Sequence, residues 1–126
     1  MSSLRDQLHA LHAHPGVRAV VAAGRDGLLI DRADGDGAGD DGADALAGAE
    51  HLAALAPGLV AAAERLTAAD GGGLRSVVVE SADALLVALP VSDEVTVLVA
   101  IDPAHADAAS SLGRVRGERG ALAGAV

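Results

Sequence analysis

Three short apolar runs follow one another between residues 74 and 101 with only a few polar residues between them, and this spacing constrains the fold most. The runs are Leu74–Glu80, Ala84–Leu89 and Val95–Ile101. Connections this short cannot hold a crossover helix, so neighbouring strands must be antiparallel. Two earlier runs, Val17–Ala23 and Leu28–Arg32, flank a Gly-Arg-Asp-Gly turn typical of a hairpin. We therefore predict five strands: a hairpin and a three-stranded meander.

Helical patterns precede, separate and follow these strands. Ser2 or Ser3 can cap a first helix, whose apolar stripe consists of Leu4, Leu8 and Leu11. Residues 43–69 are rich in Ala and Leu, and their stripe stays in phase across Pro57, which predicts one kinked helix with two short helices as the alternative. Asp102-Pro103 is a start signal for a last helix. Its core side would consist of Ala108, Leu112, Val115 and Leu122.

The predicted fold class is α/β in the mixed α+β sense, with the element order α-β-β-α-β-β-β-α. The last two runs are apolar on both faces, so helices should cover both faces of the sheet. Val95–Ile101 is the most apolar run and should lie centrally beside the first strand, which gives an antiparallel sheet of order 2-1-5-4-3. We expect one domain over residues 1–126, with a flexible acidic loop at residues 31–44.

Composition excludes several partners. The 126 residues have a net charge of −9 and contain no Lys, Phe, Tyr or Trp, which argues against nucleic acid and acidic membranes. No unbroken apolar run approaches the roughly 20 residues of a membrane helix, and the N-terminus has no signal-peptide pattern. We expect a cytoplasmic protein without membrane insertion. The lack of Lys, Asn, Phe and Tyr is typical of a GC-rich genome, which suggests a bacterial source.

Most enzyme chemistry lacks its residues here. Without Lys or Cys there is no phosphate-binding P-loop, Schiff base, thiol nucleophile or thiolate zinc site. Gly71-Gly72-Gly73 precedes a strand, whereas a phosphate cradle opens a helix. Ser76, Ser110 and Ser111 have no G-x-S-x-G context and no base near them in sequence. We predict no catalytic residues and no cofactor.

Two features hint at metals. His9 and His12 share a helix face, but no Cys or H-E-x-x-H motif joins them, so a solvated helix end is the preferred interpretation. The Asp-rich segment from Asp34 partly follows a calcium-loop pattern, yet Ala38 and Ala45 stand where oxygen ligands are required. We therefore predict no metal site.

The remaining features favour binding to other proteins. Leu74–Glu80 is an apolar edge strand, which another chain could pair, and the long helix beside it could pack against a symmetry mate. Arg65 or Arg75 could act as an arginine finger toward a nucleotide on a partner, although an ordinary surface charge is the simpler interpretation. The predicted dimer interface consists of Leu52, Leu55, Leu59, Ala63, Leu66, Arg75, Val77 and Val79.

The chain resembles the roadblock/dynein light chain superfamily, and within it the bacterial MglB-like regulators of Ras-like GTPases. The resemblance rests on His14–Val21, on the Asp26–Ile30 hairpin return, on the long Ala/Leu helix and on the three later strands, and it covers residues 4 to about 122. It implies a roadblock, profilin-like fold and a homodimer whose paired helices and joined sheets form a platform for a Ras-like small GTPase. Glu64 and Arg65 are the candidate contact surface for that GTPase. The resemblance also implies a protein without nucleophile or cofactor.

Three functions are compatible with these observations. The first is a homodimeric, non-catalytic regulator that activates or positions a Ras-like small GTPase. The second is a dimerisation scaffold for a signalling complex, with no effect on GTP hydrolysis. The third is a small-molecule sensor with a profilin-like layout. The enlarged Asp/Gly segment departs from the family pattern and leaves the choice of GTPase open.

Overall fold

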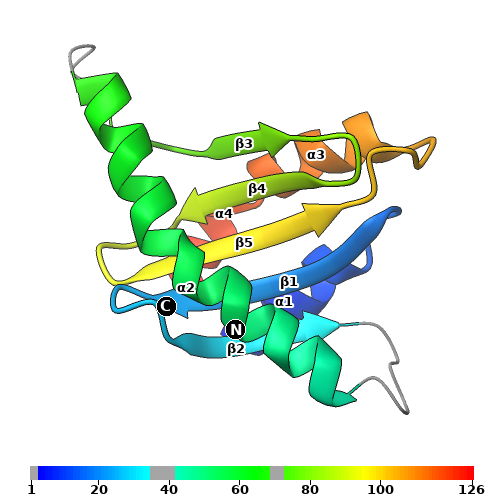
Figure 1. The fold of residues 1–126 in the computed structure, drawn as a ribbon, viewed down its shortest axis with the longest axis horizontal. Coiled ribbons are helices and arrows are strands. Elements are labelled where there is room, and N and C mark those ends of the chain that lie inside the picture. The colour runs from blue at the N-terminus through cyan, green and yellow to red at the C-terminus, as the bar shows by residue number, and fades with distance from the viewer. Residues whose placement is uncertain (1–2, 35–41, 69–72) are drawn as a thin grey trace.

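The computed structural model describes residues 3–34, 42–68 and 73–126. Its elements follow the predicted order, except that the C-terminal region forms two helices (Figure 1). They are α1 (Leu4–His12), β1 (Val17–Gly24), β2 (Leu29–Asp34), α2 (Gly42–Thr67), β3 (Val77–Glu80), β4 (Leu85–Pro90), β5 (Val95–Ile101), α3 (Ala108–Gly117) and α4 (Arg119–Ala125).

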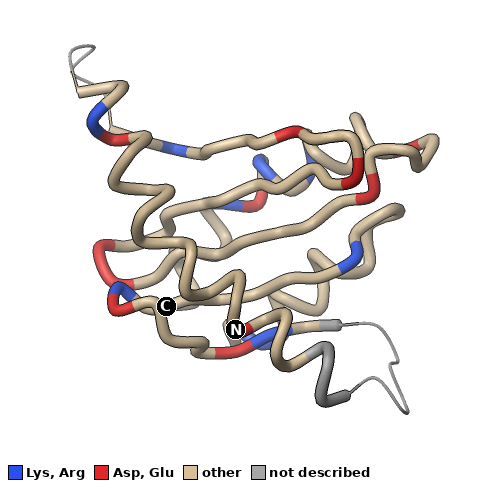
Figure 2. The backbone as a smooth tube through the Cα atoms, viewed as in Figure 1, with Lys and Arg blue, Asp and Glu red and all other residues tan. Residues whose placement is uncertain are grey.

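The five strands form one antiparallel sheet of order β2-β1-β5-β4-β3, which confirms the predicted topology. β4 and β5 contain no charged residue, and the charged positions lie in turns, in helices and in the other three strands (Figure 2). Val20, Val87 and Val99 have no exposed surface. Strands this apolar must be covered on both faces, so the central position of β5 follows from its sequence.

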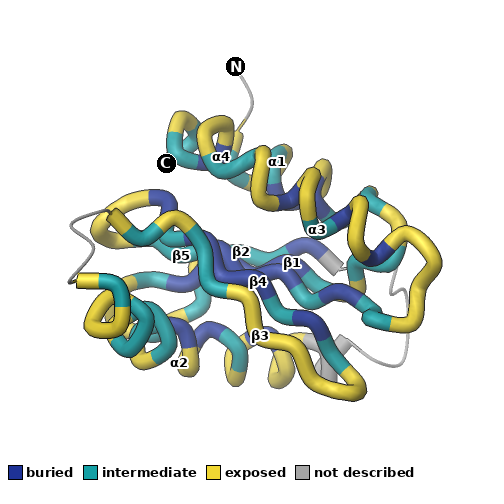
Figure 3. Tube along the Cα trace, turned by 90° about the horizontal axis from the view of Figure 1, so that it is seen from above, coloured by how far each residue is buried: buried dark blue, intermediate teal, exposed yellow. Residues whose placement is uncertain are grey.

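Helices cover both faces of the sheet, as predicted: α1, α3 and α4 lie on one face and α2 on the other (Figure 3). The first face packs Leu and Val side chains, among them Leu8, Leu89 and Leu122. The α2 face is built mainly from alanine, with Leu98 as its single fully buried leucine among the described residues. Small side chains let α2 lie close to the sheet.

Side-chain bonds fix both ends of the α1–β1 corner. Ser3 and Asp6 form a reciprocal capping box at the start of α1, each backbone N–H donating to the other side chain at 3.2 Å. At the far end, Nε2 of His14 lies 2.9 Å from Oε1 of Glu118, and the buried Ser111 hydroxyl donates to the carbonyl of Pro15. These contacts attach the corner to the C-terminal helices. Ser111 therefore has a structural role.

Several boundaries differ from the prediction. β3 begins at Val77 instead of Leu74, so the edge strand is only four residues long. The acidic segment 31–44 is partly regular: β2 continues to Asp34 and α2 begins at Gly42, while residues 35–41 lie outside the described residues. β2 gains these residues because they pair in register with β1. α2 runs unbroken across Pro57, so the prediction of a single helix is confirmed.

The start of the last helix also differs from the prediction. Asp102-Pro103 does not open it; instead the Asp102 carboxylate accepts the backbone N–H of Ala104 at 2.9 Å and holds a turn. α3 begins only at Ala108, and the helical region divides at Glu118 into α3 and α4. The prediction at Asp102-Pro103 was wrong because the same Asx side chain that caps a helix also forms a turn with its own backbone.

Helix α2 contains one stretch, Leu46–Thr67, with the length and composition of a membrane span at a mean hydropathy of 1.4. Counting only unbroken apolar runs missed it, because Glu50, Glu64 and Arg65 interrupt the pattern. One such helix is weak support for a membrane span. Its inner side packs on the sheet through Ala49, Ala53 and Ala56, yet only 17% of its 18-residue apolar window is buried. The outer side of α2 is therefore exposed.

The β1–β2 turn touches the middle of α2 through Gly27. Its φ is +82°, and a Cβ there would lie 3.4 Å from Cα of Ala54. We expect Gly27→Ala to lower the free energy of unfolding by about 1–2 kcal/mol, because a side chain is strained in this conformation. Urea unfolding followed by far-UV circular dichroism measures the loss. Gly113→Ala, in an open helical position, is the control and should leave stability equal or slightly higher. Equal effects of the two substitutions would contradict the expectation.

Candidate protein-binding surface

The outer side of α2 is the largest part of the predicted interface. A helix turns about 100° per residue, which places the leucine stripe beside the face formed by Ala49, Ala53 and Ala56. Leu52 and Leu59 are half-buried and pack against the α2 side of the sheet. Figure 3 shows exposed positions along the outer side of this helix.

The other predicted interface positions on α2 differ from Leu52 and Leu59 in how exposed their side chains are. Leu55 and Leu66 are 51% and 83% exposed, and Ala63 is half-buried. Of the predicted stripe, Leu55 and Leu66 are thus the leucines free to meet a partner. Leu52 and Leu59 also serve the chain's own core, so substituting either would disturb the fold as well as an interface.

The edge strand β3 lies at the same end of the sheet as the C-terminal half of α2 (Figure 1). It pairs with β4 and stands last in the sheet order. Val77 packs half-buried toward α2, whereas Val78 and Val79 are 41% and 43% exposed. Val78 is not among the predicted interface residues. Side chains alternate along a strand, so Val78 points to the opposite face of the sheet from Val77 and Val79. A short valine-rich edge with an unpaired side can accept another strand.

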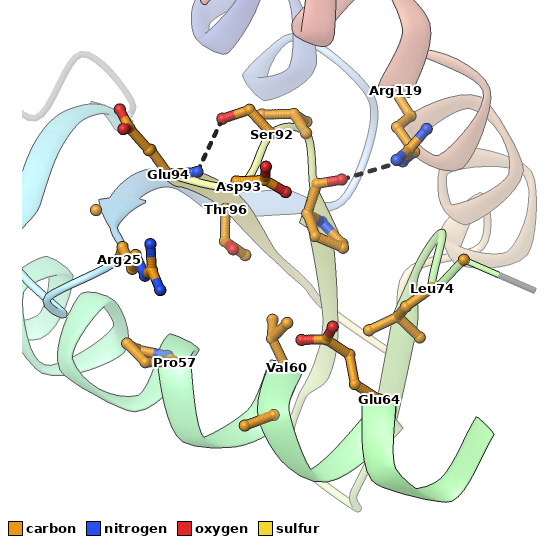
Figure 4. Close-up of a pocket in the computed structure, with 15 residues that line it drawn as sticks. Arg25, Pro57, Val60, Glu64, Leu74, Ser92, Asp93, Glu94, Thr96 and Arg119 are labelled. Atoms are coloured by element: carbon orange, nitrogen blue, oxygen red, sulfur yellow. Dashed lines mark hydrogen bonds between the residues drawn. The ribbon is translucent and has the colours of Figure 1, made fainter. Parts of the chain in front are cut away.

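Glu64 and Arg65 are both exposed near the end of α2. Glu64 points into a groove of about 780 Å³ between α2 and the β1–β2 and β4–β5 turns (Figure 4). The residues that line the groove carry charges of both signs. Arg25 and Arg119 are basic, and Glu64, Asp93 and Glu94 are acidic. Sequence reasoning missed the residues of the two turns, because turn residues at separate points in the chain meet only in the fold. Arg65 does not line the groove.

The remaining candidate residues do not form a site. His9 is exposed and His12 half-buried at the end of α1. Within residues 3–34, 42–68 and 73–126, no three His, Asp or Glu side chains are grouped as metal ligands would be. The Asp-rich residues 36–41 and two of the glycines, Gly71 and Gly72, lie outside the described residues. Ser76 is half-buried, and the Ser110 hydroxyl donates to the carbonyl of Asp107.

Asp31 forms an ion pair that makes stability depend on pH. Burial acts to raise the pKa of Asp31, but hydrogen bonds from the Arg5 side chain and the Arg32 backbone, with the charge of Arg5, together lower it. A carboxyl with a lowered folded-state pKa stabilises the fold above its unfolded pKa of about 3.9, and this contribution is lost as the pH falls through the folded value. We therefore expect Asp31→Asn to be less stable than the original protein at pH 7 and to lose less stability between about pH 5 and pH 2. Parallel pH curves for the two proteins in urea unfolding would contradict this.

Sequence and structure comparisons place the chain among known proteins. A profile of the Roadblock/LC7 domain family matches residues 4–101. No curated protein sequence matches at a significant level. A Roadblock/LC7 domain from Streptomyces avermitilis is similar in structure at a TM-score of 0.74 and 24% identity, covering 99% of this chain and 95% of that one.

Two MglB proteins have the same fold. MglB from Myxococcus xanthus is similar at a TM-score of 0.73 and 20% identity, with 96% of this chain and 92% of that chain covered. The gliding protein MglB from Thermus thermophilus is similar at 0.74 and 18% identity, with 97% and 87% covered. At these identities the likeness concerns the fold. The family profile spans most of the chain, and the chain therefore belongs to the Roadblock/LC7 domain family.

Proposed function

We propose that this protein is a homodimeric, non-catalytic regulator of a Ras-like small GTPase in the cytoplasm. The observation that carries the proposal is a 26-residue apolar helix, α2, whose outer side is exposed near β3, an edge strand that pairs with β4 on one side only. Apolar surface of this extent is seldom left uncovered on a soluble protein. A second copy covers helix and edge together, because a twofold axis beside β3 joins the two sheets and places the helices on one face.

The geometry of such a dimer restricts the register of β3 against its copy. A twofold axis perpendicular to the sheet keeps the same face upward in both copies, so residues directly opposite must point to the same face. Centred on Val78, the pairing sets Val77 opposite Val79 of the second copy. Centred on Val77 it would set Val79 opposite Arg75, and centred on Val79 it would set Val78 opposite Glu80. Valine against valine is the most favourable, so we place Val78 on the axis.

The predicted interface residues keep their roles in this proposal with one distinction. Leu55, Leu66 and Val79 supply exposed apolar surface, while Leu52, Leu59 and Val77 support it from the core side. Glu64 and Arg65, near the end of α2, are the proposed contacts for the GTPase. A Ras-like partner is supported by membership of the Roadblock/LC7 family and by the resemblance to MglB-like regulators. The proposed dimer and its contact with a GTPase involve neither membrane insertion nor a cofactor.

GTP turnover by a Ras-like GTPase from the same organism, with and without this protein, tests the proposal. We expect turnover to rise at least about tenfold, equal to about 1.4 kcal/mol of activation free energy. Glu64→Arg should abolish most of the rise by weakening binding. Arg65→Ala distinguishes two modes of action: an arginine finger would produce a rise on the order of 1,000-fold or more and its removal would abolish nearly all of it, whereas reshaping of the GTPase by contact would keep most of the rise.

A different result would change the assignment. Tight binding without any change in turnover would replace the activator by a scaffold that assembles a signalling complex. Absence of binding to any Ras-like GTPase would contradict both.

The groove beside Glu64 favours one further candidate, a small-molecule sensor, because its volume of about 780 Å³ is in the range of ligand pockets. A ligand that raises the melting temperature, and loses this effect in Glu64→Arg, would support the sensor.

A further inference from the structure

A second groove, of about 510 Å³, lies between the segment that enters β3 and the junction of α3 with α4. Its lining includes Arg75, Ser76, Arg116, Gly117, Arg119 and Gly120. These residues come from two parts of the chain that are far apart in the sequence: the segment before β3, and the consecutive helices α3 and α4. The proposed GTPase contact at Glu64 and Arg65 does not use this groove, but Arg75 is also one of the predicted dimer-interface residues, and Arg119 also lines the larger groove beside Glu64.

The lining of this groove carries only positive charge. Three of the nine arginines of a chain with net charge −9 line it, and no Asp or Glu does. Figure 2 shows basic positions at the entry to β3 and around the α3–α4 junction. Glu118 is the acidic residue nearest in sequence, but its Oε1 lies 2.9 Å from Nε2 of His14. Glu118 is therefore directed toward His14 through Oε1, and it does not line the groove.

The arginine side chains are available to a ligand. Among the described residues, neither Arg75 nor Arg116 forms a hydrogen bond or an ion pair. Arg119 donates from Nε to the carbonyl of Pro90 at 3.2 Å, a bond that orients its guanidinium (Figure 4). Unpaired guanidinium groups of the same charge repel one another, and a bound oxyanion would relieve that repulsion while accepting paired N–H bonds.

The glycines leave room for the ligand. A Cβ added at Gly113, Gly117 or Gly120 would meet no atom within 4 Å. The ligand must be compact, because the net charge of −9 repels an extended polyanion. The chain has no aromatic side chain on which a base could stack, so the ligand is not expected to be recognised through an aromatic ring. A phosphate monoester meets these conditions with a charge of about −2 and three acceptor oxygens.

We infer that this groove binds a phosphate monoester, held by Arg75, Arg116 and Arg119. The phosphate can belong to a small phosphorylated molecule or to a phosphorylated side chain of a partner protein, and both present the same oxygens. Phosphate binding here uses neither Glu64 nor Arg65, so the inference stands or fails independently of the proposed GTPase contact.

Isothermal titration of the full chain tests the inference with three probes: inorganic phosphate, a short peptide with one phosphoserine, and the same peptide unphosphorylated. We expect at least one phosphorylated probe to bind and the plain peptide not to bind. The phosphopeptide binding at least tenfold more tightly than phosphate would identify a partner protein as the source. Equal affinities would identify a small phosphorylated molecule.

Two variants and one control make the test specific. Arg116→Gln should weaken binding at least tenfold, and Gly120→Leu should block the groove sterically without strain. Arg114→Gln removes the same charge from the same helix outside the lining and should leave binding unchanged. Circular dichroism verifies that each variant is folded. No binding of either phosphorylated probe at millimolar concentration, or equal losses in Arg116→Gln and Arg114→Gln, would overturn the inference.

Discussion

Replacing Val78 by arginine is expected to convert the protein from a dimer into a monomer of 12.3 kDa. Val78 is placed on the twofold axis, so the substitution sets two guanidinium groups against each other in a surface that the dimer desolvates. Like charges in such a position cost several kcal/mol, and the dissociation constant should rise at least about 100-fold. In the single chain Val78 is 41% exposed, so its own fold should tolerate arginine.

Light scattering coupled to size exclusion measures this change. Detection must use refractive index or far-UV absorbance, because the chain has no Trp, Tyr or Cys. Leu28→Arg is the matched control: Leu28 is 67% exposed and precedes the opposite edge strand, β2. It should leave the mass unchanged. A dimer that survives Val78→Arg would show that β3 is not the interface.

The second large effect is expected from Leu98→Ala, which should destabilise the fold by about 2–5 kcal/mol. Leu98 is 1% exposed in β5 and packs on the α2 side of the sheet, in a cluster that includes Ala49 and Ala53 of α2 and Ala88 of β4. Small neighbours cannot move in to fill the space that a lost isobutyl group leaves. The loss is a large part of the roughly 5–15 kcal/mol that stabilises a typical domain.

Chemical unfolding monitored by far-UV circular dichroism measures the loss at Leu98. Leu28→Ala makes the same chemical change at an exposed position and should cost less than about 0.5 kcal/mol. The comparison also tests whether α2 is packed on the sheet, because Leu98 lies in the same buried cluster as the inward-facing alanines of α2. Similar small losses for both variants would mean that α2 is not packed on the sheet as described.

Much of the fold could be predicted because its signals are local. The short turns of the meander require antiparallel neighbours, and the apolar character of Val95–Ile101 requires a central strand. The predicted boundaries that differ lie where local signals are ambiguous. Leu74-Arg75-Ser76 has the composition of a strand, yet β3 pairs with β4 only from Val77. Asp102 caps a turn with the same side chain that can cap a helix.

The candidate surface was predicted less completely for a geometric reason. The leucine stripe of α2 was visible in the sequence, but its angle to the sheet depends on which alanines face inward. The fold shows that Leu52 and Leu59 pack on the core side while Leu55 and Leu66 are exposed. The arginine groove was not predictable at all, because its two sides meet only through tertiary packing. Arg75 stands far from the other two arginines in the sequence.

The mass of the complex with a Ras-like GTPase is the most direct test of the proposed function. The two purified proteins are mixed, with the GTPase bound to a non-hydrolysable GTP analogue, and light scattering measures the mass of the eluting species. We expect a single complex that contains two copies of this chain and at least one GTPase, and the Val78→Arg variant should fail to form it. Separate elution of the GTPase and a 12.3-kDa monomer would contradict both the dimer and its role as a GTPase partner.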